Sequence, residues 1–139
     1  MIIHPRHFVR FIDGRAGNHV VIAFLPGHLG GYLRTLQTDV TLRRDYALKL
    51  VKHKIDYHTF GEIQNTIDSG YCLRVDESRM AFLYVKDPLK PEVYFLLLKT
   101  DRTRSELWLV TFHRIRKAQF DRRLKAGMLI REHLDEFME

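Results

Sequence analysis

The sequence has little of what a disulfide-stapled, membrane-spanning or metal-built protein requires. It contains one cysteine among 139 residues, so no internal disulfide can form and a reducing, cytoplasmic setting is expected. No apolar run is long enough to cross a membrane, and the first residues lack the apolar stretch of a secretory signal. No Cys/His grouping has the spacing of a structural zinc site. We therefore expect a cytoplasmic protein with no membrane partner, no metal and no other cofactor.

Two common catalytic motifs are missing as well. Gly27, Gly30 and Gly31 are not followed by the lysine and hydroxyl residue that a phosphate-cradling loop needs. No Gly-x-Ser-x-Gly elbow is present. Cys72 stands at the start of a predicted strand and is expected to be a small core residue rather than a nucleophile. Any chemistry would therefore use other groups.

What the sequence does have is positive charge. Lysine and arginine number 23 against 17 aspartate and glutamate, which gives a net charge of +6 before the eight histidines are counted. An excess of this sign favours polyanionic partners, and nucleic acid is the commonest of these. The composition thus favours a nucleic-acid-binding protein without requiring one.

Hydrophobic periodicity predicts an α+β fold. The expected order is an amino-terminal hairpin, two helices, a four-stranded antiparallel sheet and a carboxy-terminal helix. Phe8–Ile12 and His19–Leu25 are the predicted hairpin strands, with turn residues between them. A single domain would span the whole chain and comprise a hairpin and connector over 1–35, a core over 41–116 and a helical tail over 117–139.

Capping residues place the two central helices. Thr41 is the candidate N-cap of the first helix. Thr59 is that of the second, with Glu62 completing a capping box and Gly70 ending the helix. Four strand-like segments follow, and the short links between them imply an antiparallel meander. These segments are Tyr71–Asp76, Met80–Lys86, Val93–Thr100 and Glu106–Arg114.

The last predicted strand changes from apolar to polar along its length. Strict alternation puts Trp108, Val110 and Phe112 on one side. The other side would carry Leu107, Leu109, Thr111 and His113. Both sides are apolar before Thr111, which is typical of a buried central strand. Trp108 and Phe112 are therefore expected to be largely buried, with Leu96 and Leu98 as cross-strand neighbours.

A candidate site combines two groups of polar residues. Its members are Lys52 and His53 near the end of the first helix, and Thr111, His113, Arg114 and Arg116 at the end of the last strand. Metal-free RNA cleavage needs a base for the 2′-hydroxyl, an acid for the leaving 5′-oxygen and cations for the phosphorane. Histidine suits the first two roles because its unperturbed pKa is about 6.5. Arginine suits the third because its planar fork matches phosphate oxygens.

Each of these residues also has a simpler interpretation. His53 fits a solvated helix position, and His113 fits a histidine at the end of a strand. A strand that turns polar where it leaves the core needs no catalytic explanation. The nuclease interpretation rests on the combination in a basic chain and not on any one residue.

The chain also resembles the barnase/EndoU/colicin/RelE-like nuclease superfamily, which includes phage and bacterial toxin RNases. The resemblance covers roughly Tyr46–Arg116 and rests on three short segments. These are Tyr46-Ala47…Val51-Lys52-His53-Lys54-Ile55, Glu62-Ile63…Ile67…Gly70 and Val110-Thr111-Phe112-His113. It implies a basic or histidine residue on the leading helix, matched by Lys52 or His53. It also implies a polar group on the final core strand, matched by Thr111 with His113.

Together these observations predict a small metal-independent endoribonuclease that leaves 2′,3′-cyclic phosphate ends. His53 and His113 would share the acid–base work, Thr111 would orient the phosphate, and Lys52, Arg114 and Arg116 would hold it. The expected partners are RNA, with tRNA as one candidate, and a cognate protein inhibitor. The alternative is a non-catalytic regulator or inhibitor that docks on nucleic acid or protein.

Overall fold

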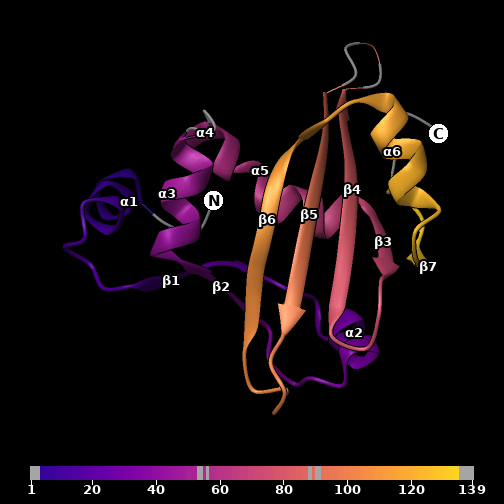
Figure 1. Ribbon diagram of the computed structural model, residues 1–139, viewed down its shortest axis with the longest axis horizontal. Helices are drawn as coiled ribbons and strands as arrows, with labels where there is room; N and C mark the ends of the chain where they lie inside the picture. Colours follow the sequence, from indigo (N-terminus) through magenta and orange to yellow (C-terminus); the bar gives the residue numbers. More distant parts are fainter. Residues whose placement is uncertain (1–3, 53–54, 56, 88, 90–91, 135–139) are drawn as a thin grey trace.

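The chain folds around one seven-stranded mixed sheet, with helices packed on its two faces (Figure 1). The computed structural model describes residues 4–52, 55, 57–87, 89 and 92–134. The strands are β1 (His19–Phe24), β2 (Asp39–Arg43), β3 (Tyr71–Arg74), β4 (Arg79–Asp87), β5 (Glu92–Thr100), β6 (Leu107–Ile115) and β7 (Met128–Arg131). The helices are α1 (Pro5–Ile12), α2 (Gly27–Gly30), the 3-10 helix η1 (Gly31–Leu33), α3 (Arg44–Lys52), α4 (Tyr57–Phe60), α5 (Glu62–Ser69) and α6 (Lys117–Leu124).

The expected four-stranded antiparallel sheet is wrong, although the chain is α+β. The strand order is β1-β2-β6-β5-β4-β3-β7. The four central strands do form an antiparallel meander. β2 joins β6 in parallel at Thr41 and Trp108, and β7 joins β3 on the other side. Residues 41–43 of β2 and the whole of β7 lie in segments that were predicted from the sequence to be helical.

The amino-terminal hairpin is also wrong, because residues 5–12 form a helix. The His4 imidazole accepts a hydrogen bond from the Arg6 backbone N–H, and Pro5 occupies the first helical turn. Proline is favoured there because its fixed φ suits a helix start. Phe8 and Phe11 then share the buried side of α1. A spacing of three residues suits a helix, whereas the predicted alternation of apolar and polar residues suits a strand. The helix cap at the start of the segment decides in favour of the helix.

β1 instead pairs with β2, which contains Thr41. Thr41 is therefore a strand residue and not an N-cap, and α3 begins at Arg44. The Arg44 guanidinium donates hydrogen bonds to the carbonyl oxygens of Phe11 and Ile12. This contact ties the end of α1 to the start of α3.

The predicted capping box of the second helix is wrong as well. Thr59 lies buried inside the short helix α4, and α5 starts at Glu62 after Gly61. The predicted end at Gly70 is confirmed. A Cβ at Gly70 would lie 2.7 Å from the carbonyl oxygens of Leu83 and Thr66, so only glycine fits between α5 and β4.

The carboxy-terminal segment is helical only as far as Leu124. Residues 128–131 form β7, which pairs antiparallel with β3. Gly127 makes the turn possible because a Cβ there would lie 2.8 Å from the Arg74 carbonyl oxygen. The predicted helical tail is thus a helix followed by an edge strand.

Two hydrophobic clusters lie on opposite faces of the sheet. The larger one joins the sheet to α1, α2, α3 and α5, and in Figure 1 α5 crosses behind the central strands. Phe112 is fully buried in it and stacks on Tyr94, with ring centroids 5.2 Å apart. The smaller cluster lies where α6 packs over β3, β4 and β5. Among the described helices, none is long and apolar enough to cross a membrane.

Candidate functional site

A β-bulge in β6 decides which side chains share a face. Leu98 pairs with Leu109 and Leu97 pairs with Thr111, which leaves Val110 as an extra residue on β6. A bulge of this kind shifts the alternation of side chains by one residue. Leu107, Leu109 and Phe112 therefore all belong to the main core. Trp108 instead lies on the same face as Thr111 and His113.

We call this second face, where α6 does not cover it, the open face. Its defining residues are Arg43 on β2, Lys99 on β5, and Trp108, Thr111 and His113 on β6. Cross-strand pairs on this side of the sheet are Lys99 with Trp108, Leu97 with Thr111 and Phe95 with His113. Phe95 itself is buried in the smaller cluster under α6. Trp108 is half-buried, which corrects the expectation that it lies in the core beside Phe112.

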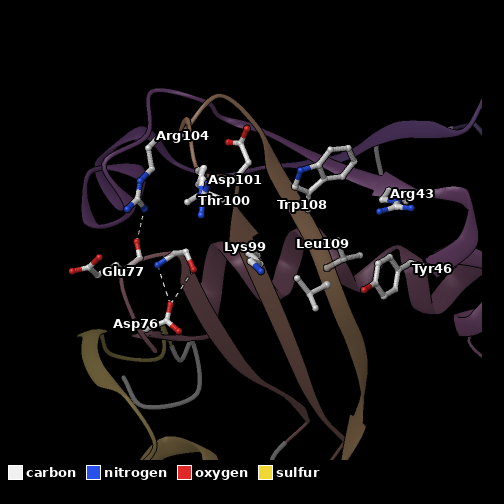
Figure 2. A pocket seen from close by; sticks show the side chains of 13 residues that line it. Arg43, Tyr46, Asp76, Glu77, Lys99, Thr100, Asp101, Arg104, Trp108 and Leu109 are labelled. Atoms are coloured by element: carbon white, nitrogen blue, oxygen red, sulfur yellow. Dashed lines mark hydrogen bonds between the residues drawn. The ribbon is translucent and has the colours of Figure 1, made fainter.

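A groove of about 770 Å³ crosses the open face (Figure 2). One end is aromatic and basic: Tyr46 from the first turn of α3 and Trp108 contribute rings, and Arg43 and Lys99 contribute cations. Its floor includes Leu109 and Val110. The volume is within the range of about 300–1,000 Å³ that small-ligand pockets occupy.

Each of the two rings of the groove has a polar neighbour. The Lys49 ammonium lies 5.5 Å from the centre of the Tyr46 ring. The His19 ring meets Trp108 edge-on, with centroids 6.5 Å apart. Arg43 is bound to Asp45 at 3.0 Å on the exposed surface. Lys99 is exposed and makes no ion pair with any described carboxylate.

The other end of the groove carries both signs of charge, because Arg102 and Arg104 line it together with Asp76, Glu77 and Asp101. Two of these carboxylates are bonded within their own loops. Asp76 accepts hydrogen bonds from Arg79 and from the Ser78 backbone, and the Arg79 side chain is the main reason that its pKa falls to about 2. Asp101 accepts from Thr103 and from the backbone of Ser105 and Glu106, and the Thr103 hydroxyl leads in lowering its pKa to about 2.

Arg104 fixes this end of the groove. Its guanidinium donates to the carbonyl oxygens of Leu33 at 3.1 Å and Glu77 at 2.5 Å, as Figure 2 shows for Glu77. Its own carbonyl oxygen accepts from the buried Thr35 hydroxyl at 2.7 Å. One residue thus links the β5–β6 loop to η1 and to the β3–β4 turn.

Two of the predicted catalytic residues lie together. Thr111 Oγ1 and His113 Nδ1 are 3.1 Å apart on the open face, just beyond the bulge. The imidazole also packs edge-on against Phe95, with centroids 5.7 Å apart. These contacts orient the ring of His113. His53, the predicted partner of His113, is outside the described residues.

The predicted phosphate-binding residues do not gather at one place. Arg114 lies on the opposite face of β6 from His113, where its guanidinium contacts Glu92 at 3.2 Å and donates to the Thr59 hydroxyl. Arg116 follows β6 and is exposed at the start of α6, with its backbone N–H donating to Gln119. Lys52 is exposed in the last turn of α3.

Arg114 belongs to a charged network that connects α5 with the sheet. Lys86 contacts Glu62 at 3.2 Å and Glu92 at 3.9 Å, and the hydrogen bond with Glu62 is the main reason that the pKa of Lys86 is raised. Tyr94 donates to Glu92 at 2.6 Å. Burial is the main reason that the pKa of Tyr94 is raised. The partners satisfy one another, so this network is structural.

Other candidate groups are easily placed. Cys72 is buried in the core, as expected, and burial raises the pKa of its thiol to about 12. A thiol with so high a pKa is unsuited to nucleophilic attack. Among the described residues, no group of three or more His, Cys, Asp or Glu could hold a metal ion. Comparisons with protein-family models, curated proteins and solved structures found no match to this chain.

The groove itself was not predicted from the sequence. Trp108 and Lys99 were assigned to ordinary strand positions, and Arg43 and Tyr46 to a helix. The available signal was the mixture of aromatic and cationic residues around Trp108. That mixture is also ordinary strand composition, and only the bulge and the β2–β6 pairing bring the four side chains together.

Proposed function

We propose that this protein binds RNA on the open face of its sheet and cleaves it without a metal. The observation that carries the proposal is the Thr111–His113 pair, 3.1 Å apart, on the face that also carries the groove with Trp108 and Lys99. A proton-transfer group therefore lies on the same surface as stacking rings and cations. The net charge of +6 supports a polyanionic substrate.

The chemistry proposed for this surface is transesterification. The 2′-hydroxyl oxygen of the ribose attacks the adjacent phosphorus, the bond from phosphorus to the 5′-oxygen breaks, and a 2′,3′-cyclic phosphate remains. One proton leaves the 2′-hydroxyl and one reaches the departing 5′-oxygen. An imidazole can accept or donate either proton near neutral pH. DNA is excluded as a substrate because it lacks the attacking hydroxyl.

The roles are assigned to the residues that share the open face. His113 transfers a proton, and the contact of Thr111 with its Nδ1 positions the ring. Lys99 and Arg43 provide positive charge beside Trp108. Arg114 is not assigned to phosphate, because it lies on the opposite face of the sheet, where it contacts Glu92 and Thr59. Arg116 and Lys52 are exposed cations that can contact the RNA backbone away from the groove.

His53 remains the sequence-based candidate for the second proton-transfer group. The resemblance to the barnase/EndoU/colicin/RelE-like superfamily implies the same class of reaction, a histidine or basic residue on the leading helix and a cognate inhibitor. These points are part of the proposal and rest on the sequence. The open face with Thr111 and His113 supports it independently.

The test is cleavage of total RNA by the purified full chain in excess EDTA. We expect fragments with 2′,3′-cyclic phosphate ends, and loss of cleavage in the His113→Ala variant. His28→Ala is the matched control, because His28 is an exposed histidine on α2. RNA binding without cleavage would favour the non-catalytic regulator instead. Activity lost on chelation would contradict the metal-free mechanism.

A further inference from the structure

We infer that the groove is a subsite for one unpaired nucleotide of the RNA, whose base stacks on Trp108 and Tyr46 while Lys99 and Arg43 hold the adjoining phosphate. This inference rests on the proposal that RNA is the substrate. It adds that the substrate is single-stranded at the groove, and that the nucleotide bound there is a neighbour of the one that is cut.

The bulge leaves an aromatic ring partly uncovered where a core residue was expected. Trp108 lies in a sheet between Thr41 of β2 and Lys99 of β5, and it is half-buried. Figure 2 shows Trp108 and Tyr46 at the same end of the groove. Aromatic rings beside cations are the usual platform for unpaired bases, because every base has a π-face.

The charges of the groove differ between its two ends. Asp76, Glu77 and Asp101 line the end nearest the β5–β6 loop together with Arg102 and Arg104, so that end carries both signs of charge. Lys99 and Arg43 lie beside Trp108. Because Thr111 and His113 follow Trp108 on the same face of β6, the reacting nucleotide is placed along β6 on the side away from the loop.

Spacing along β6 separates the groove from the cleavage point. With Val110 as the extra residue, Trp108 and His113 are four ladder positions apart, about 13 Å at the usual rise of a strand. One nucleotide cannot place its base on Trp108 and its scissile phosphate at His113 over that distance. The groove thus binds a nucleotide next to the one that reacts.

Only unpaired RNA satisfies this arrangement. In a duplex the bases are stacked inside the helix and their faces are unavailable to a protein ring, so recognition by stacking targets loops and single strands. The groove volume of about 770 Å³ has room for one flipped base with its sugar.

Fluorescence of Trp108 tests the inference directly, because the chain contains one tryptophan. The full-length His113→Ala variant, which cannot turn over the RNA, is titrated with a single-stranded oligoribonucleotide and with the blunt duplex of the same sequence. We expect quenching that saturates with the single strand, and an apparent affinity at least tenfold weaker for the duplex. Equal quenching by both, or none with either, would overturn the subsite.

Substitutions provide the second measurement, read by anisotropy of labelled RNA. Trp108→Ala should weaken binding by roughly tenfold to a hundredfold, the usual range for one stacked base, and Trp108→Phe should retain most of it. Tyr32→Ala is the matched control, because Tyr32 is an exposed aromatic residue on η1. If Trp108→Ala fails to fold, the RNA affinity of Lys99→Ala is compared with that of Lys125→Ala. Weaker binding is expected only for Lys99→Ala. Unchanged affinity in Lys99→Ala, and also in Trp108→Ala if it folds, would refute the inference.

Cleavage of short substrates separates this inference from the proposed function. Because the groove binds a neighbouring nucleotide, Trp108→Ala should raise KM for a long oligomer by a larger factor than for a dinucleotide. Saturable quenching without any cleavage would remove the nuclease and leave the subsite. Cleavage of long and short RNA with kinetics that do not depend on Trp108 would retain the nuclease and remove the subsite.

Discussion

Trp108 and Thr111 lie on the same face of β6, although three positions of strict alternation would put them on opposite faces. Val110 is the residue that makes this possible, because it has no partner of its own on β5. Bulges recur beside functional sites since they redirect one side chain without ending the strand. Here the redirected group is an indole, and it is placed on the face that carries the Thr111 hydroxyl and the His113 imidazole.

The first prediction contrasts Phe112 with Val110. Phe112 is fully buried and stacked on Tyr94, so Phe112→Ala should lower the free energy of unfolding by about 3–5 kcal/mol through the cavity it leaves. Val110 is partly exposed at the bulge, and Val110→Ala should cost less than about 1 kcal/mol. Urea unfolding followed by circular dichroism measures both. Similar costs for the two variants would contradict the assignment of faces.

A second prediction concerns catalysis at His113. Loss of a positioned proton-transfer group usually lowers a rate by roughly 10²–10⁴, and we expect this drop in single-turnover cleavage by His113→Ala. RNA affinity should change little, because Lys99 and Arg43 remain. With two histidines in opposite protonation states, the pH profile of the wild-type rate should be bell-shaped. Full activity of His113→Ala would remove the central residue of the proposed site.

Acid should weaken the β5–β6 loop through Asp101. Its pKa in the folded chain is about 2, below its ordinary value of 3.8, so the folded state binds this proton less readily than the unfolded state. Its contribution to stability is therefore complete above about pH 4 and is lost as the pH falls toward about 2. Asp101→Asn should be less stable than wild type at pH 6, and the difference should vanish near pH 2. A gap that persists unchanged into acid would show that the charge of Asp101 is irrelevant.

The glycine at the end of α5 gives a fourth prediction. Gly70→Ala puts a Cβ 2.7 Å from two backbone carbonyl oxygens, and backbone must shift to accept it. We expect a cost of about 1–3 kcal/mol, the usual range for overpacking. Gly27→Ala is the control, since nothing lies within 4 Å of the added Cβ. Thermal melts of the two variants should differ clearly, and equal melting temperatures would contradict the close approach of α5 to β4.

Salt distinguishes an RNA partner from a protein partner. Each phosphate that is neutralised releases condensed counterions, so log affinity should fall against log salt with a slope near −0.7 per contact on a single strand. We expect Lys99→Ala to reduce the slope by roughly that amount. A flat salt response would instead point to recognition of a protein.

Strong periodic segments were predictable, and the meander from β3 to β6 is the clearest case. Its apolar runs are flanked by turn residues, which local chemistry recognises. Phe8 and Phe11 were ambiguous, because a spacing of three in a short segment suits a helix and an irregular strand alike. Thr41 was misassigned because Thr in a strand and Thr at an N-cap have the same local signature, and only pairing with β1 decides.

The candidate site was only partly predictable for the same reason. Thr111 and His113 are two residues apart on a strand, so their proximity follows from the pleat. Trp108 could not be placed with them, because the position of a bulge depends on how β5 and β6 align. The amino-acid composition of the strand does not reveal it. Arg43 and Lys99 come from strands far apart in the chain, and the register of the whole sheet determines where they meet.

The parallel pairing of Thr41 with Trp108 also has a consequence for the order of folding. Hairpin-linked strands β3 to β6 can assemble by local closure, whereas β2 must wait until β6 exists and then dock on a strand that is distant in the sequence. During synthesis on the ribosome, the aromatic and basic end of the groove is therefore completed only after β6 has emerged. Until β6 has emerged, the nascent chain contains neither Trp108 nor His113, so the groove and the Thr111–His113 pair form only late in synthesis.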